Sequence, residues 1–176
     1  MYFSFFPYLF VHCLFLFYLA LHLTHMIQPT KAKQTIGRRE LIDFPELGLF
    51  NITAKVDTGA YTTALHCHDI REENGILYFK LLDPSHPDYT EKEQQFRSYF
   101  QKEIKNSFGE MEKRYIIKTL IKIGRRRINS LISLTDRGTM RYPVLIGRKL
   151  LKKRFVVDVA LLNNIPPLIK KKKSKP

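Results

Sequence analysis

The amino-acid sequence predicts an all-β fold, a small closed β-barrel with one short helix. Short runs of apolar, β-branched and aromatic residues recur from residue 34 onward, and clusters of Gly, Pro, Asn or Asp separate them. One stretch, RKLLKK at residues 148–153, has the character of a short amphipathic helix. Many short strands separated by turn signals are typical of a small barrel.

The strands are expected where apolar runs lie between turn residues. In chain order they are residues 40–43, 50–56, 64–70, 75–82, 113–124, 128–136, 142–147 and 154–162. Residues 83–107 differ from these runs, because they are polar, highly charged and open with two prolines. We expect that segment to be an exposed excursion with one short helix.

The chain has 176 residues, which suits one domain with a tail at each end. We place the domain at residues 34–162 and predict that the basic tail, 163–176, is disordered. Residues 1–25 are strongly hydrophobic and lack Lys, Arg, Asp and Glu. They suit either a membrane anchor or a start codon assigned too early, with Met26 as the true first residue. Both interpretations place the domain in the cytoplasm, in the first case attached to the inner membrane.

The formal net charge of +14 favours acidic partners: acidic peptide, nucleic acid or an anionic membrane. Basic runs at residues 124–127, 148–154 and 170–175 could be solvated charge, a surface for an acidic substrate, or a nucleic-acid contact. The two cysteines, Cys13 and Cys67, do not make a disulfide framework.

The segment AKVDTGAYTTALH, residues 54–66, contains the most informative motif. An apolar strand leads directly into Asp57, Thr58 and Gly59, which are suited to hold a carboxylate in one place. A plain turn is the alternative, since Asp and Gly are common in turns. Peptide hydrolysis by acid–base chemistry needs two carboxylates that share a proton. The sequence holds a single Asp-Thr-Gly, so the second carboxylate would come from another copy of the chain.

A second motif, PVLIGRKLL at residues 143–151, combines an apolar strand, a Gly and a turn of helix. Together the two motifs resemble the retropepsin-like aspartic peptidases. The resemblance is closest to small bacterial proteins of that fold that carry the name ATP-dependent zinc protease. It covers residues 35–159 and rests on further segments that match in order: TIGRRELIDFPELGL, EKRYIIKTLIKIG, SLTDRGTMRYPVLIGRKLL and RFVVDV.

The resemblance implies a homodimer and a role for each matching residue. Asp57 would be the catalytic aspartate, Thr58 would brace the same loop in the partner subunit, and Gly59 would let the two loops meet. Residues implied to bind substrate or support the loop are Ala60, Tyr61, Thr62, Gly147 and Arg148.

Two positions depart from that branch of the family. It usually carries a basic residue after Asp-Thr-Gly-Ala and a Ser two residues further on, whereas this chain has Tyr61 and Thr63. Thr retains the hydroxyl group. Tyr removes a positive charge close to the expected dyad, which bears on substrate preference and on activity.

The words zinc and ATP in that family name find little support in the residues. The HCH triplet at 66–68 places His66 and His68 on one face of a strand, which is most simply a solvated face. His86 lies in the polar excursion, and a tetrahedral zinc would need further ligands. No phosphate-binding G-x-x-x-x-G-K-[ST] motif and no G-x-S-x-G motif occurs in the sequence. We therefore expect neither a metal nor a cofactor.

The sequence thus predicts an aspartic-type peptidase that is active as a homodimer. Its substrate would be acidic or rich in glutamate, because members of this branch are associated with ATP-grasp ligases that add glutamates to proteins. The alternative is a non-catalytic barrel whose basic surface binds acidic peptide or RNA.

Overall fold

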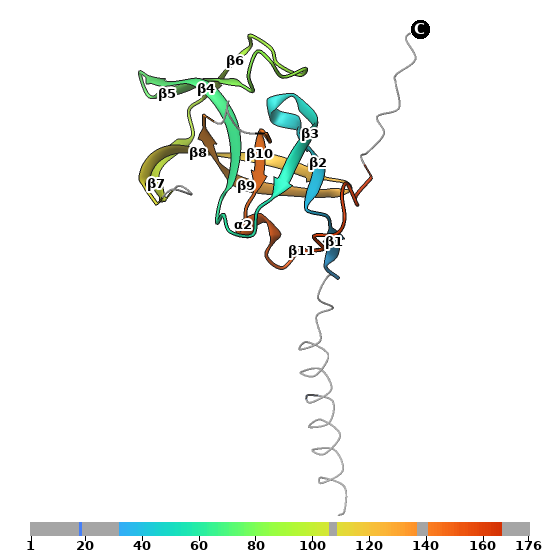
Figure 1. Ribbon diagram of the computed structural model, residues 1–176. Coiled ribbons are helices and arrows are strands. Elements are labelled where there is room, and N and C mark those ends of the chain that lie inside the picture. The colour runs from blue at the N-terminus through green and yellow to red at the C-terminus, as the bar shows by residue number, and fades with distance from the viewer. Residues whose placement is uncertain (1–17, 19–31, 106–108, 137–140, 167–176) are drawn as a thin grey trace, which may run out of the picture. The chain divides into compact units, whose positions relative to one another are not determined.

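The computed structural model describes residues 18, 32–105, 109–136 and 141–166 (Figure 1). The chain from Lys33 onward forms one compact unit. The predicted all-β barrel with one short helix is confirmed within residues 32–166. The helix is α2, Arg148–Leu151, and a single 3₁₀ turn, η1, spans Pro45–Leu47.

Eleven strands lie within the described residues. Their bounds are β1 Gln34–Ile36, β2 Arg39–Phe44, β3 Leu49–Val56, β4 Thr63–Glu73, β5 Ile76–Leu81, β6 Glu93–Phe96, β7 Tyr99–Lys105, β8 Met111–Ile123, β9 Arg126–Thr135, β10 Val144–Ile146 and β11 Phe155–Val157.

Six of these strands close into the barrel. They follow one another in the order β10, β3, β2, β8, β9 and β4, and β4 pairs back onto β10. The short strand β10 therefore lies between β3, to which it is parallel, and β4, to which it is antiparallel (Figure 1). Closure satisfies the backbone hydrogen-bonding groups that an open sheet would leave at its edges.

The other strands extend the barrel at its margins. β5 pairs with the long strand β4, and β6 pairs with β5. β7 pairs antiparallel with the first part of β8 and so extends the sheet beside that strand. β1 and β11 form a separate two-stranded parallel sheet.

The barrel interior is filled by alternate residues of the strands, as the period of two requires. Large side chains there that are less than 2% exposed include Phe44, Ile52, Leu65, Ile117 and Ile132. Val144 and Ile146 of β10 are fully buried, and Leu145 between them faces outward. The buried ends of β3 and β10 thus fix the backbone at the point where each strand stops.

Glu40 is a charged residue at an inward position, and it is fully buried. Its carboxylate accepts hydrogen bonds from the backbone N–H groups of Gly37 (2.6 Å), Asn164 (3.1 Å) and Ile165 (3.1 Å). Ile165 is itself buried at 3% exposure. The domain boundary at residue 162 stays a prediction, and this packing indicates a boundary a few residues later.

The expectation for residues 83–107 was wrong in one respect. Where that segment is described it contains two strands, β6 and β7, and no helix. Phe96 stacks against Phe79 of β5, and Tyr99 meets the edge of Tyr115 of β8. β6 pairs with the edge of β5, and β7 pairs with the edge of β8. Pairing partners so distant in sequence cannot be detected from the composition of the polar segment itself.

Several other expectations lie outside the described residues. They concern the hydrophobic segment 1–25, in which Tyr18 alone is described, Met26, and the tail from residue 167. In the part of the chain that is described, no helix has both the length and the apolar character to cross a membrane.

Replacing Glu40 tests the role of its buried carboxylate. Glu40→Ala should lower the free energy of unfolding by about 3 kcal/mol or more, because several buried N–H groups would lose their acceptor. Glu73→Ala removes an exposed carboxylate from an ion pair with Arg71 and should cost less than about 1 kcal/mol. Urea unfolding of both variants measures the difference, and equal losses would contradict this role.

Candidate active site

The Asp-Thr-Gly loop begins where two parallel strands end together. Asp57 directly follows β3, and its backbone N–H donates to the carbonyl of Ile146, the last residue of β10, at 3.0 Å. The loop then runs through Ala60 and Thr62 into β4. Three barrel strands therefore determine the position of a loop of six residues, 57–62.

The Asp57 carboxylate is held by its own loop. Oδ1 accepts hydrogen bonds from the backbone N–H groups of Gly59 (2.9 Å) and Ala60 (3.1 Å), a short-range pattern that Asp adopts readily in turns. Among the described residues no group donates to Oδ2. The side chain is partly exposed, so one oxygen is fixed and the other is available to a water or a second carboxyl group.

Arg148 braces the loop from the start of helix α2. One guanidinium nitrogen, Nη1, donates to the carbonyls of Thr58 (3.0 Å) and Gly59 (2.9 Å). Its backbone N–H donates to the carbonyl of Ala60 at 2.8 Å, and the next N–H along the helix donates to the carbonyl of Tyr61. The four carbonyls of residues 58–61 thus all accept hydrogen bonds from the beginning of α2.

Gly147 lets the helix and the loop come this close. A Cβ atom at this position would lie 2.6 Å from the Thr62 carbonyl carbon and 2.9 Å from that of Tyr61. Those atoms belong to the backbone and cannot rotate away, so any other residue would push the loop from α2. The backbone N–H of Gly147 donates to Thr63 Oγ1 at 3.2 Å, which uses the hydroxyl group of that position.

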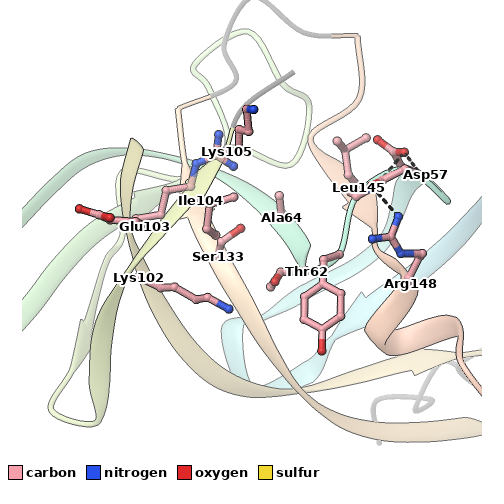
Figure 2. A pocket seen from close by; sticks show the side chains of 14 residues that line it. Asp57, Thr62, Ala64, Lys102, Glu103, Ile104, Lys105, Ser133, Leu145 and Arg148 are labelled. Atoms are coloured by element: carbon pink, nitrogen blue, oxygen red, sulfur yellow. Dashed lines mark hydrogen bonds between the residues drawn. The ribbon is translucent and has the colours of Figure 1, made fainter. Parts of the chain in front are cut away.

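The loop forms one wall of a groove of about 550 Å³. Figure 2 shows Asp57 and Arg148 on one side, Lys102, Glu103 and Ile104 on the other, and Ala64 and Ser133 between them. The second wall comes from β7 and the adjoining part of β8. The lining residues are Asp57, Gly59, Ala60, Tyr61, Thr62, Ala64, Lys102, Glu103, Ile104, Lys105, Arg114, Ser133, Leu145 and Arg148.

Positive charge predominates in this groove. Its cations are Lys102, Lys105, Arg114 and Arg148, against the carboxylates of Asp57 and Glu103. Arg114 is paired with Glu112 at 2.6 Å, outside the lining set, and is thereby neutralised. The remaining excess of positive charge favours a substrate with carboxylate groups.

The wall that faces Asp57 was not predicted from the sequence. Lys102, Glu103 and Lys105 belong to the segment expected to be an exposed excursion. Their place in the groove depends on the pairing of β7 with β8, which brings Lys102 opposite Arg114. The aromatic residues Tyr99 and Phe100 and the apolar Ile104 favour a strand there.

The HCH triplet does not behave as a solvated strand face, and this expectation was wrong for His66. That residue is 2% exposed, with Nε2 at 2.8 Å from Asp83 Oδ2 and Nδ1 at 3.8 Å from Asp136 Oδ1. Within the described residues, no group of three or more His, Cys, Asp or Glu side chains is placed to hold a metal ion. Cys67 is buried in the core, and burial raises the pKa of its thiol well above the usual value, which makes it a poor nucleophile.

A family model of the "Retropepsin-like aspartic endopeptidase RimB" matches residues 35–166. The chain belongs to this RimB-like family. The retropepsin-like part of the predicted resemblance is therefore confirmed, and Asp57 with its loop lies inside the matched region.

Two relatives carry the name probable alpha-L-glutamate ligase. The protein from Desulfotalea psychrophila is 33% identical over 134 residues, which is 74% of this chain and 29% of the relative. The protein from Shewanella halifaxensis is 34% identical over 134 residues, which is 72% of this chain and 28% of the relative. The chain therefore spans less than a third of the length of these relatives, and neither of them carries the name ATP-dependent zinc protease.

A solved structure has a similar fold. It is a protein of unknown function from Legionella pneumophila, 25% identical, with a TM-score of 0.54. The similarity covers 77% of this chain and all of that protein.

The brace on the loop can be tested with Arg148→Met. Losing the two bonds to the carbonyls of Thr58 and Gly59 should loosen the loop and speed amide hydrogen exchange at Gly59 and Ala60. Because the guanidinium is exposed, the free energy of unfolding should fall by only about 1 kcal/mol. Lys149→Met is the matched control, since its side chain is exposed and does not line the groove. Equal exchange in the two variants would show that Arg148 does not hold the loop.

Proposed function

We propose that this protein is an aspartic peptidase whose active site is completed when two copies bring their Asp57 carboxylates together. The observation that carries the proposal is the Asp57 carboxylate itself, which lines the groove and has Oδ1 fixed by two backbone N–H groups. Among the described residues, Glu103 is the one other carboxylate that lines this groove, and it belongs to the opposite wall. Membership of an aspartic endopeptidase family supports the same activity.

The proposed mechanism uses one proton shared by two carboxylates. Two adjacent carboxylates resist double ionisation, so one is charged while the other is protonated. The charged group takes a proton from a water, and the water oxygen attacks the carbon of the scissile carbonyl. The protonated group donates its proton to the carbonyl oxygen. When the tetrahedral intermediate breaks down, a proton passes to the leaving nitrogen and the C–N bond is cleaved, so no covalent bond to the enzyme forms.

The loop contacts explain how the remaining predicted residues would contribute. Gly59 leaves the rim of the loop without a side chain, which permits a second loop to approach. Gly147 and Arg148 would keep Asp57 in place under that contact, since their N–H groups donate to loop backbone or to Thr63. Thr58 is exposed. A residue that contacts the loop of a second copy has to be accessible before the two copies assemble.

We infer that the substrate is an acidic protein segment, with glutamate-rich tails as the preferred class. The positive groove is one reason. The other is that a region like this chain occurs within proteins named as probable glutamate ligases, where a peptidase could remove what the ligase adds. We propose a functional link to a ligase of that ATP-grasp type and a cytoplasmic location for the domain.

A non-catalytic barrel that binds acidic peptide or RNA is the alternative. A set of cations that do not line the groove favours it, because in the described part of the chain these side chains form no ion pair with a carboxylate. The set comprises Lys122, Arg127, Lys149 and Lys152.

Asp57→Asn separates catalysis from binding. The amide keeps the shape of the side chain and an acceptor for Gly59 and Ala60, but it cannot exchange the proton. Hydrolysis of a glutamate-rich peptide should fall at least ~10²-fold while the thermal unfolding temperature changes little. A purified Asp57→Asn protein that cleaves as fast as the parent would exclude the aspartic mechanism, and a parent that binds the peptide without cleaving it would favour the alternative.

Mixing experiments test whether two chains share one active site. Asp57→Asn chains added to parent chains should form heterodimers with one carboxylate and one amide, which cannot act as both acid and base. Activity should fall in proportion to the parent chains they capture, and parent activity should fall faster than linearly on dilution below the dimer dissociation constant. Rates measured beside sedimentation equilibrium provide the test. A monomer with constant specific activity, unaffected by mutant chains, would contradict the shared site.

A further inference from the structure

Lys102 reaches across the groove to the loop that carries Asp57. Its ammonium nitrogen lies 5.7 Å from the centre of the Tyr61 ring, within the range of a cation–π contact. Tyr61 is four residues after Asp57 and is 57% exposed, which is unusual for a large aromatic side chain. Figure 2 shows the Lys102 side chain extended from β7 toward Thr62, the neighbour of Tyr61.

Lys102 differs from the other cations of the groove. The Arg148 guanidinium donates hydrogen bonds to loop carbonyls. Arg114, the cross-strand partner of Lys102, forms an ion pair with Glu112. Lys105 lies three residues further along β7, about 10 Å away at the rise of an extended strand. Within the described residues Lys102 forms no ion pair with a carboxylate, so its charge remains available to a ligand.

The aromatic ring gives that charge a defined place. An isolated lysine on a strand samples many rotamers, and its ammonium group binds an anion weakly because ordering the side chain costs entropy. The face of Tyr61 attracts the ammonium group and restricts it to the side of the groove near Asp57. A substrate carboxylate can still approach the ammonium group from the side that faces away from the ring.

We propose that Lys102, positioned by Tyr61, binds a side-chain carboxylate of the substrate close to the scissile bond. Lys102 is then a residue that determines specificity, and Tyr61 is a positioning residue. This inference rests on the proposed peptidase function, since it takes Asp57 as the point of cleavage. It assigns the choice of an acidic residue to one contact across the groove, whereas the general positive field of the protein would attract any acidic chain.

The first test measures binding without catalysis, so that it does not depend on the outcome for the aspartic mechanism. The probes are two fluorescent peptides with amidated C-termini, one of five glutamates and one of five glutamines. Each is titrated into the Asp57→Asn protein and its Kd is measured by fluorescence anisotropy. The glutamate peptide should bind more tightly, and Lys102→Gln should weaken its binding about fivefold, the upper range for an exposed ion pair. Binding of the glutamine peptide should not change.

Lys118→Gln is the matched control for net charge. Lys118 is exposed on β8 and does not line the groove, so its removal lowers the charge of the protein by the same amount. It should leave the ratio of the two Kd values within about twofold of the parent. An equal loss in Lys118→Gln and Lys102→Gln would assign the preference to the general field and overturn the proposal. The proposal would also be overturned if Lys102→Gln bound the glutamate peptide as tightly as the parent does.

Variants of Tyr61 test its positioning role. Tyr61→Phe keeps the ring face and should retain the glutamate preference, whereas Tyr61→Leu should lose most of it. Adding Tyr61→Leu to Lys102→Gln should cause little further loss, because the two residues act as a unit. Additive losses would mean that Tyr61 contacts the peptide independently and would overturn its role in placing Lys102.

Cleavage kinetics of the parent and Lys102→Gln complete the test. If Lys102 binds substrate, KM for a glutamate peptide should rise about fivefold with kcat little changed. A loss in kcat alone would overturn the assignment. Failure of the peptidase function would instead appear as an absence of hydrolysis in both proteins, whatever the binding titrations give. A glutamine peptide with a free C-terminal carboxylate in place of the amide should not show Lys102-dependent binding. If it does, Lys102 binds a chain end and the proposal is wrong.

Discussion

Strand β10 closes the barrel and supports the candidate active site through the same hydrogen bonds. Its three residues pair with β3 on one side, and two of them, Val144 and Leu145, pair with β4 on the other. The ladder ends at Ile146, whose carbonyl accepts from Asp57, and the chain then turns through Gly147 into the helix that carries Arg148. The position of Asp57 therefore depends on barrel closure, and a change that opened the barrel would also displace the carboxylate.

This dependence explains why so small a loop can be held firmly while it is exposed. Residues 58–61 are exposed or only partly buried, and exposed loops of that kind are usually mobile. Here every carbonyl of those four residues accepts a hydrogen bond from the beginning of α2. The order of the loop thus comes from the barrel beneath it, and its outer side stays free for substrate and for the second copy that we propose.

The two walls of the groove have different origins and suit different tasks. The wall with Asp57 is built on central strands of the barrel, whereas the wall with Lys102 lies on β7, which pairs on one side with β8. A marginal strand can change its side chains with little cost to the core. The proposed chemistry would then reside on the rigid wall and the proposed choice of substrate on the variable one.

The sequence by itself determined the barrel class, the positions of the central strands along the chain, and the two motifs that meet at the Asp57 loop. These are local signals, since apolar alternation marks strands, and the Asp-Thr-Gly triplet is distinguished from a plain turn by the second motif, PVLIGRKLL. Tertiary structure decided the rest. β7 became a strand because β8 offered it an edge to pair with, and His66 became buried because of packing around β4. Lys102 came to lie over Tyr61, 41 residues earlier in the chain, because their two segments form facing walls of the groove. Contacts of this kind depend on pairing between distant parts of the chain, and the residues in either segment alone do not encode them.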